Sequence, residues 1–124
     1  MLDKTDRTCI IIGDGISLKW FDIKLFKDFN VIPIALLWFH KDVKHLKIDS
    51  SILLEPFWIY PVMRFPTHSG KVIFNPIQKK YKKIIKNNPL TKFYIDRSNY
   101  PSLIFNNNIE FIYRFHNHLF IDID

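Results

Sequence analysis

The chain has 124 residues and a formal net charge of +6, with 48% hydrophobic and 16% aromatic residues. This length is typical of one domain, and the apolar content excludes a disordered tail. No apolar run reaches the about 18 residues that a membrane-spanning helix needs, and residues 1–7 are too polar for a secretory signal. A single cysteine, Cys9, excludes an internal disulfide framework and a multi-cysteine zinc module, which favours a cytoplasmic location.

The positive charge comes mainly from lysine, because 14 of the 18 basic residues are Lys and four are Arg. Ile and Asn are also abundant and Ala occurs once, which is typical of a coding bias that raises the pI of any protein. Proteins that recognise nucleic-acid bases prefer arginine. The charge therefore does not favour a nucleic-acid partner.

The first predicted strand covers residues 9–12, where one cysteine and three isoleucines form a continuous apolar run. Such a run indicates a parallel strand buried on both faces, so Cys9 is expected in the core. A glycine turn follows at residues 13–18. Strand, glycine turn and helix together are typical of the opening of a βαβ unit.

The helix predicted after this turn has Ser17 as a candidate N-cap. Leu18, Phe21 and Leu25 follow at the spacing of one helical face, and Asp22 is able to cap a second short turn.

Three further strands are predicted at residues 31–37, 51–54 and 92–95. Pro33 cannot donate a ladder hydrogen bond, so the second strand either starts late or lies at a sheet edge. Residues 56–70 combine prolines with aromatic side chains and indicate a long ordered loop.

The most regular helical pattern covers residues 76–86, with Asn75 as the N-cap and Pro76 in the first turn. Isoleucines and a tyrosine form one face and five lysines form the other. Residues 98–108 are predicted to be a loop, and the aromatic run 110–123 matches no single element type.

The glycine turn is the main chemical signal. Gly13 and Gly15 allow a ligand to approach the backbone, and the helix that follows offers free N–H groups to a phosphate. The pattern lacks the third glycine of a dinucleotide motif and the lysine of a P-loop. On spacing alone, a nucleotide site and a plain tight turn both remain open. Asp14 is suited to accept a hydrogen bond from a sugar or a base rather than to face a phosphate.

Residues 13–18, Gly-Asp-Gly-Ile-Ser-Leu, resemble the G-(N/D)-G-P-S-L opening of a bacterial glycosyltransferase-like family. This family includes lipooligosaccharide sialyltransferases and the related domains of motility-associated glycosylation factors. Residues 22–26 resemble the stretch that follows in the family, and residues 51–56 resemble its third strand. The resemblance covers residues 8–60 well and residues 76–115 loosely.

The resemblance implies a Rossmann-like fold, a nucleotide-activated sugar as donor, a carbohydrate acceptor and no metal cofactor. The donor is CMP-linked in the sialyltransferases. The residues that the resemblance assigns to the nucleotide and its phosphate are Gly13, Asp14, Gly15 and Ser17, and it places Glu55 near the donor sugar. Independently, His40 is a candidate site residue because it follows the second predicted strand.

Three residues depart from the family pattern: Ile16 replaces Pro, Ala35 stands roughly where a donor-binding Asn is found, and Glu55 replaces a second Asn. The later half of the family, which carries the catalytic His, has no counterpart in this sequence. We therefore expect residues 1–124 to form a single α/β, Rossmann-like parallel half-domain of about four strands with flanking helices. This half-domain would be the N-terminal half of a longer transferase for surface carbohydrate or lipopolysaccharide synthesis. Alone it is expected to be marginally stable, to self-associate or to be completed by a partner chain, and its catalytic residues stay unassigned.

Two other classes remain open: a non-catalytic nucleotide- or sugar-binding module, and a basic binder of nucleic acid or of the inner membrane surface that uses the lysines of residues 79–86. Their regular spacing against an apolar stripe favours a solvated helix face instead. His116 and His118 would share one face if extended, but no convincing third ligand accompanies them, so no metal site is expected.

Overall fold

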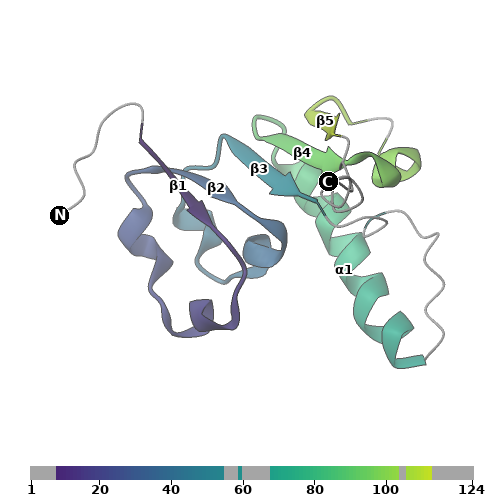
Figure 1. Cartoon of the computed structure of the whole chain (residues 1–124), viewed down its shortest axis with the longest axis horizontal. Helices are drawn as coiled ribbons and strands as arrows, with labels where there is room; N and C mark the ends of the chain where they lie inside the picture. Colours follow the sequence, from purple (N-terminus) through teal and green to yellow (C-terminus); the bar gives the residue numbers. More distant parts are fainter. Residues whose placement is uncertain (1–7, 55–58, 60–67, 104–105, 113–124) are drawn as a thin grey trace, which may run out of the picture.

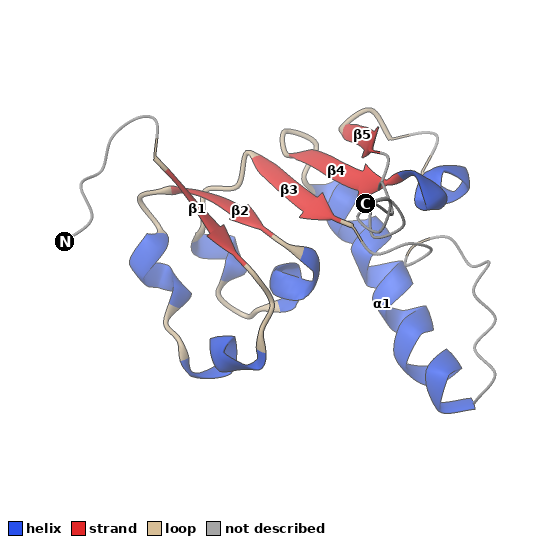
Figure 2. Ribbon diagram, viewed as in Figure 1, coloured by secondary structure: helices blue, strands red, loops and turns tan. Residues whose placement is uncertain are grey.

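The computed structural model describes residues 8–54, 59, 68–103 and 106–112, with the backbone alone for residues 68–75 and 102. Within these residues, five short parallel strands follow one another in chain order, and helices connect them (Figures 1 and 2). The strands are β1 (Cys9–Ile12), β2 (Asn30–Pro33), β3 (Ser50–Leu53), β4 (Lys92–Asp96) and β5 (Ile109–Ile112). β1 pairs with β2, while β3, β4 and β5 form a separate three-stranded sheet.

The division into two sheets follows from Pro33. The Val31 N–H donates to the Lys47 carbonyl at 2.9 Å on the β3 side of β2, and Pro33 faces that same side two residues later. Pro33 has no amide hydrogen, so the β2–β3 ladder cannot be completed there. Among the described residues, the backbone contact between the two sheets consists of isolated bridges, at Asn30 with Lys47 before β3 and at Ile34 after β2 with Ile52.

A side-chain relay replaces part of the missing ladder. The Ser51 hydroxyl donates to the Pro33 carbonyl at 3.1 Å, and the Trp38 indole N–H donates to Ser51 Oγ at 2.8 Å. All three residues are buried. This relay therefore holds the two sheets together across the proline.

The helices are one long α-helix and five short 3₁₀ helices among the described residues. They are η1 (Ile16–Trp20), η2 (Ile23–Phe26), η3 (Ala35–Phe39), η4 (Val43–His45), α1 (His68–Asn87) and η5 (Arg97–Ser102). α1 packs on β3 and β4, where Tyr81 and Ile85 are buried against Phe93 and Ile95 (Figure 1). Burying each such apolar side chain contributes about 1.5–3 kcal/mol.

The core has two clusters that meet at η3. The larger cluster contains Trp38 and the buried hydrophobic residues of β3, β4 and α1, whereas the smaller one contains Ile12, Val31 and Leu37. Leu37 and Trp38 are neighbours on η3 but pack into different clusters. η3 therefore links the β1–β2 sheet to the rest of the fold.

Several predicted elements need correction. The strand predicted at residues 31–37 ends at Pro33, because Ala35 adopts a positive φ of 50° that turns the chain into η3. The single helix predicted after the glycine turn is instead η1 and η2, separated by extended backbone at Phe21. Ser17 lies inside η1 and is not its cap, whereas Asp22 does cap η2 by accepting the Lys24 N–H at 3.1 Å.

The long helix was placed correctly but begins too late in the prediction. α1 begins at His68, so Asn75 is not its N-cap and Pro76 lies inside it. The strands predicted near residues 9–12, 51–54 and 92–95 are confirmed to within one residue as β1, β3 and β4. The predicted loop at residues 98–108 contains η5, and β5 opens the aromatic run that matched no element type.

The α/β class with parallel strands is confirmed, but a four-stranded Rossmann half-domain is wrong. β1 is also not buried on both faces. Its Cys9 is exposed, and its Ile11 is 61% exposed, whereas Ile12 is buried. The expectation of a core cysteine was therefore wrong as well.

Candidate functional site

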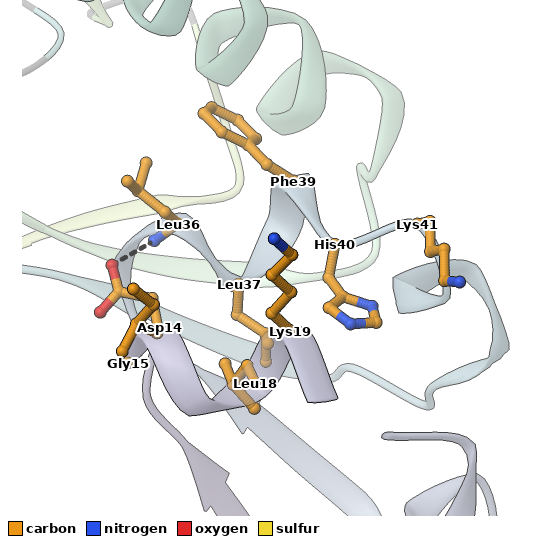
Figure 3. Close-up of a pocket in the computed structure, with 10 residues that line it drawn as sticks. Asp14, Gly15, Leu18, Lys19, Leu36, Leu37, Phe39, His40 and Lys41 are labelled. Carbon is orange, nitrogen blue, oxygen red and sulfur yellow. Dashed lines mark hydrogen bonds between the residues drawn. The ribbon is translucent and has the colours of Figure 1, made fainter. Parts of the chain in front are cut away.

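A cavity of about 570 Å³ lies at the carboxyl ends of β1 and β2. One wall is the segment that follows β1, and the other is η3 with the residues after it (Figure 3). Its lining residues are Asp14, Gly15, Ile16, Leu18, Lys19, Leu36, Leu37, Phe39, His40 and Lys41. The carboxyl ends of parallel strands are where ligands bind in α/β proteins, because the connecting loops converge there.

A hydrogen bond joins the two walls. The Leu36 N–H donates to the Asp14 carboxylate, with 3.2 Å between the nitrogen and Oδ2 (Figure 3). This bond depends on Ala35, whose positive φ directs the chain after β2 into η3. A non-glycine residue in this region of φ costs about 1–2 kcal/mol, and such strain is found preferentially at functional sites.

The ionisable groups of the cavity are mainly basic. Lys19 and Lys41 are exposed, His40 is half-buried, and Asp14 is the single carboxylate among the lining residues. His40 Nδ1 accepts the Asp42 N–H at 3.1 Å, so Nε2 carries the hydrogen when the imidazole is neutral. The site therefore offers hydrogen-bond donors and positive charge, which suit an anionic ligand.

The apolar lining is anchored in the core. Leu37 is buried in the smaller cluster, and Phe39 packs on the larger one. The Phe39 ring meets the Tyr81 ring edge-on at 6.1 Å, and Lys80 Nζ lies 4.6 Å from its centroid. α1 thereby fixes one apolar edge of the cavity, against which a planar ring or a sugar face could pack.

The two glycines of the turn are not required by the fold. Neither has a positive φ, and Gly15 has the extended values φ −58° and ψ 151°. A Cβ at Gly13 would meet nothing within 4 Å, and one at Gly15 would meet only Ser17 Oγ at an ordinary 3.7 Å. Both positions would accept a side chain, so the absence of one leaves the backbone open to a ligand.

Of the residues named from the sequence, Asp14, Gly15 and His40 come together at the cavity. Gly13 and Ser17 are exposed nearby and are not among its lining residues. Glu55, most of the loop at residues 56–70, and the His116/His118 pair lie outside the described residues.

Sequence reasoning missed Lys19, Lys41 and the Leu36 backbone. Lys41 directly follows His40, and Lys19 comes four residues after Gly15. Their closeness in sequence to these candidate site residues is the signal that could have identified them. What the sequence did not show is that η1 and η3 face each other across one cavity.

Among the described residues, no group of three or more His, Cys, Asp or Glu side chains is arranged to hold a metal ion. The same part of the chain contains no helix of the length and hydropathy required to cross a membrane. No family model, curated protein or solved structure matches the chain.

Proposed function

We propose that the chain binds a nucleotide-activated sugar in the cavity described above, between the segment after β1 and η3, as a glycosyltransferase-like module. The observation that carries this proposal is the cavity itself, in which an open glycine turn, two lysines and an apolar wall meet at the carboxyl ends of two parallel strands. The resemblance of residues 13–18 to the glycosyltransferase-like family names the class of ligand.

Each part of the cavity matches one part of such a ligand. Lys19 and Lys41 supply positive charge for the phosphates. The second oxygen of the Asp14 carboxylate can accept from a ribose hydroxyl or a base amine while Oδ2 holds the Leu36 N–H. Phe39 and Leu37 provide apolar contact for a base or a sugar ring.

The reaction expected of the family is displacement of the nucleotide from the anomeric carbon by an acceptor hydroxyl. Cations beside the phosphates would favour it, because negative charge builds up on the leaving group. The proposal assigns no general base to the described residues. It therefore concerns donor binding, and transfer would require groups elsewhere in the chain or on a partner chain.

The test is thermal unfolding and calorimetric titration of the full chain with CMP, UMP and GMP. A ligand present at about 100 times its Kd stabilises a protein by about 2.7 kcal/mol, which raises the Tm by roughly 8–14 °C at this size. We expect one nucleotide to do so, and we expect the binding to persist in EDTA because no metal is required.

Variants locate the binding site. Gly15→Val should abolish the shift by placing a branched side chain at the cavity wall, and Lys19→Gln with Lys41→Gln should weaken binding at least tenfold. Lys83→Gln removes an exposed lysine of α1, away from the cavity, and should bind as the parent does. Circular dichroism verifies that each variant is folded. Equal losses in Lys83→Gln, or no shift with any nucleotide, would overturn the proposal.

A further inference from the structure

Large apolar side chains are exposed in one region of the molecule. Among the described residues, five of the eight exposed large hydrophobic side chains lie between residues 11 and 25. Ile16 is 90% exposed, Trp20 83% and Leu25 67%. A soluble surface normally carries such side chains singly, so this clustering indicates a contact surface.

Lysines are interspersed with these apolar side chains. Lys19 Nζ lies 5.2 Å from the centre of the Trp20 ring. Lys24 lines two adjoining hollows, one with Trp20 and the other with Leu25. We define the η1–η2 surface as Ile16, Lys19, Trp20, Phe21, Lys24, Leu25 and Lys27, all of which are exposed.

The acidic residue between the two helices is already engaged. Asp22 accepts the Lys24 backbone N–H at 3.1 Å and caps η2. Its carboxylate therefore has a local structural role, whereas among the described residues no carboxylate forms a salt bridge with the Lys24 or Lys27 ammonium group. The surface thus combines protruding apolar groups with available positive charge.

We propose that the η1–η2 surface docks on an anionic lipid bilayer. The charge complementarity is direct, because lysines near a membrane surface are attracted to anionic headgroups. Tryptophan favours the membrane–water interface, where its apolar ring is buried and its N–H stays hydrated. Ile16 and Leu25 are the other strongly exposed apolar side chains of this surface that would enter the acyl boundary.

A protein partner fits this surface less well. Lysine is depleted in the buried cores of protein–protein interfaces because its ammonium is strongly hydrated. Here lysines alternate with the apolar residues instead of surrounding them. At a bilayer, a lysine keeps its ammonium among the phosphates while its carbon chain follows the apolar groups inward.

The lysine face of α1 is a useful contrast. Lys79, Lys82 and Lys83 are exposed there, but Tyr81 and Ile85 are buried against the sheet. That face can attract anions, but its described apolar residues cannot insert. A lysine of this face, Lys83, therefore serves as a control position below.

This inference does not depend on the proposed function, although the two surfaces touch. Ile16 and Lys19 belong both to the η1–η2 surface and to the cavity lining. Docking would therefore bring the mouth of the cavity close to the headgroup layer.

The experiment is co-sedimentation of the full chain with vesicles of phosphatidylcholine plus phosphatidylglycerol, and with phosphatidylcholine alone. We expect binding to the anionic vesicles, weaker binding to the neutral ones, and a decrease as salt is raised. Leu25→Ser should lower the affinity about tenfold through lost apolar burial. Lys24→Gln and Lys27→Gln should each lower it about fivefold.

Matched controls are Leu90→Ser, which removes a 97% exposed leucine elsewhere, and Lys83→Gln on α1. Both should bind as the parent does. Quenching by brominated lipid should report Trp20 and should fall strongly in Trp20→Phe, which keeps an aromatic anchor.

Three results would overturn the proposal: no sedimentation with anionic vesicles, equal loss in the control variants, or undiminished quenching in Trp20→Phe. Sedimentation velocity adds a fourth. A stable dimer of the parent that Leu25→Ser dissociates, without vesicle binding, would identify a second copy of the chain as the occupant instead.

Discussion

Ala35 has a backbone conformation that alanine seldom adopts. It is the single non-glycine residue with positive φ in the described part of the chain, and its side chain is buried in the larger core cluster. Asparagine, which the sequence resemblance leads us to expect near this position, is enriched at positive φ. The position therefore has a backbone requirement that is separate from any contact of its side chain with a ligand.

The change in the free energy of unfolding on substitution of Ala35 should depend on how well the new residue tolerates a positive φ. Ala35→Gly should change the free energy of unfolding by less than about 1 kcal/mol, because relief of about 1–2 kcal/mol offsets the loss of one buried methyl, about 0.8 kcal/mol. Ala35→Val should cost more than about 2 kcal/mol, since a branched side chain is strongly disfavoured at positive φ. Urea denaturation measures both. Ser17→Gly, at an exposed site without positive φ, should cost about 0.5–1 kcal/mol. A larger loss for Ala35→Gly than for Ala35→Val would show that the strain is absent.

At the scale of elements, the contact between β2 and β3 depends on side chains more than on backbone ladders. Ser51 accepts from Trp38 and donates to Pro33, so one hydroxyl satisfies two buried polar groups. Removal of the hydroxyl takes the acceptor away from the buried Trp38 N–H and one donor away from the Pro33 carbonyl.

Ser51→Ala should therefore lower the free energy of unfolding by about 1–3 kcal/mol, because the buried Trp38 N–H loses its acceptor. Ser50→Ala provides the comparison, because the neighbouring serine lies on the opposite face of β3 and is half-buried; its effect should stay within about 0.5 kcal/mol. Both values come from urea denaturation followed by tryptophan fluorescence. Similar losses in the two variants would contradict the relay.

The pairing of β4 with β5 carries an ion pair whose strength depends on pH. Lys92 Nζ lies 2.7 Å from the Glu110 carboxylate, and this hydrogen bond, followed by the charge of Glu110, raises the pKa of Lys92 above its ordinary value of 10.5. A raised folded-state pKa stabilises the fold below the unfolded pKa, and this contribution is lost as the pH rises through the folded pKa.

The stability difference between the parent and Glu110→Gln should accordingly be small and constant near neutral pH and should vanish on the alkaline side of 10.5. The effect is modest because both side chains are half exposed to solvent. Urea midpoints of the parent and Glu110→Gln are compared at neutral pH and at a pH above 10.5, with Lys83→Gln as the reference variant. A difference that grows with alkaline pH would have the wrong sign for this ion pair.

Sequence reasoning succeeded where structure is decided locally. The isoleucine run of β1 and the apolar runs of β3 and β4 form strands because short β-branched and aromatic segments favour extended backbone. The segment after Pro33 was misread because the apolar run continues while the backbone turns at Ala35. Hydrophobic periodicity carries no information about a positive φ at an alanine.

Only part of the candidate site could be predicted, because only part of it is encoded by local sequence. Asp14, Gly15 and His40 lie next to strand ends, which can be located from sequence. Lys19 and Lys41 lie on segments whose approach depends on the packing of η1 against η3, and no local pattern encodes that contact. The face of β1 that stays exposed was also missed, since the same apolar run is compatible with one buried face or with two.

At the scale of the whole molecule, the strands of both sheets follow chain order, so neither described sheet has the reversal of strand order at which doubly wound folds bind nucleotides. The proposed site depends instead on the convergence of two loops at the β1–β2 edge. Whether the chain is the N-terminal half of a longer transferase stays a prediction, and a nucleotide site at this edge would be compatible with it.

The most direct test of the nucleotide site is a two-dimensional ¹H–¹⁵N spectrum of the chain, recorded during titration with CMP, UMP and GMP in turn. We expect saturable shifts of the Gly15 and Leu36 amides, since these groups lie on opposite walls of the cavity. Shifts at residues 14–19 and 36–41 should exceed those on α1. Unchanged Gly15 and Leu36 signals with all three nucleotides, or shifts confined to the lysine face of α1, would contradict it.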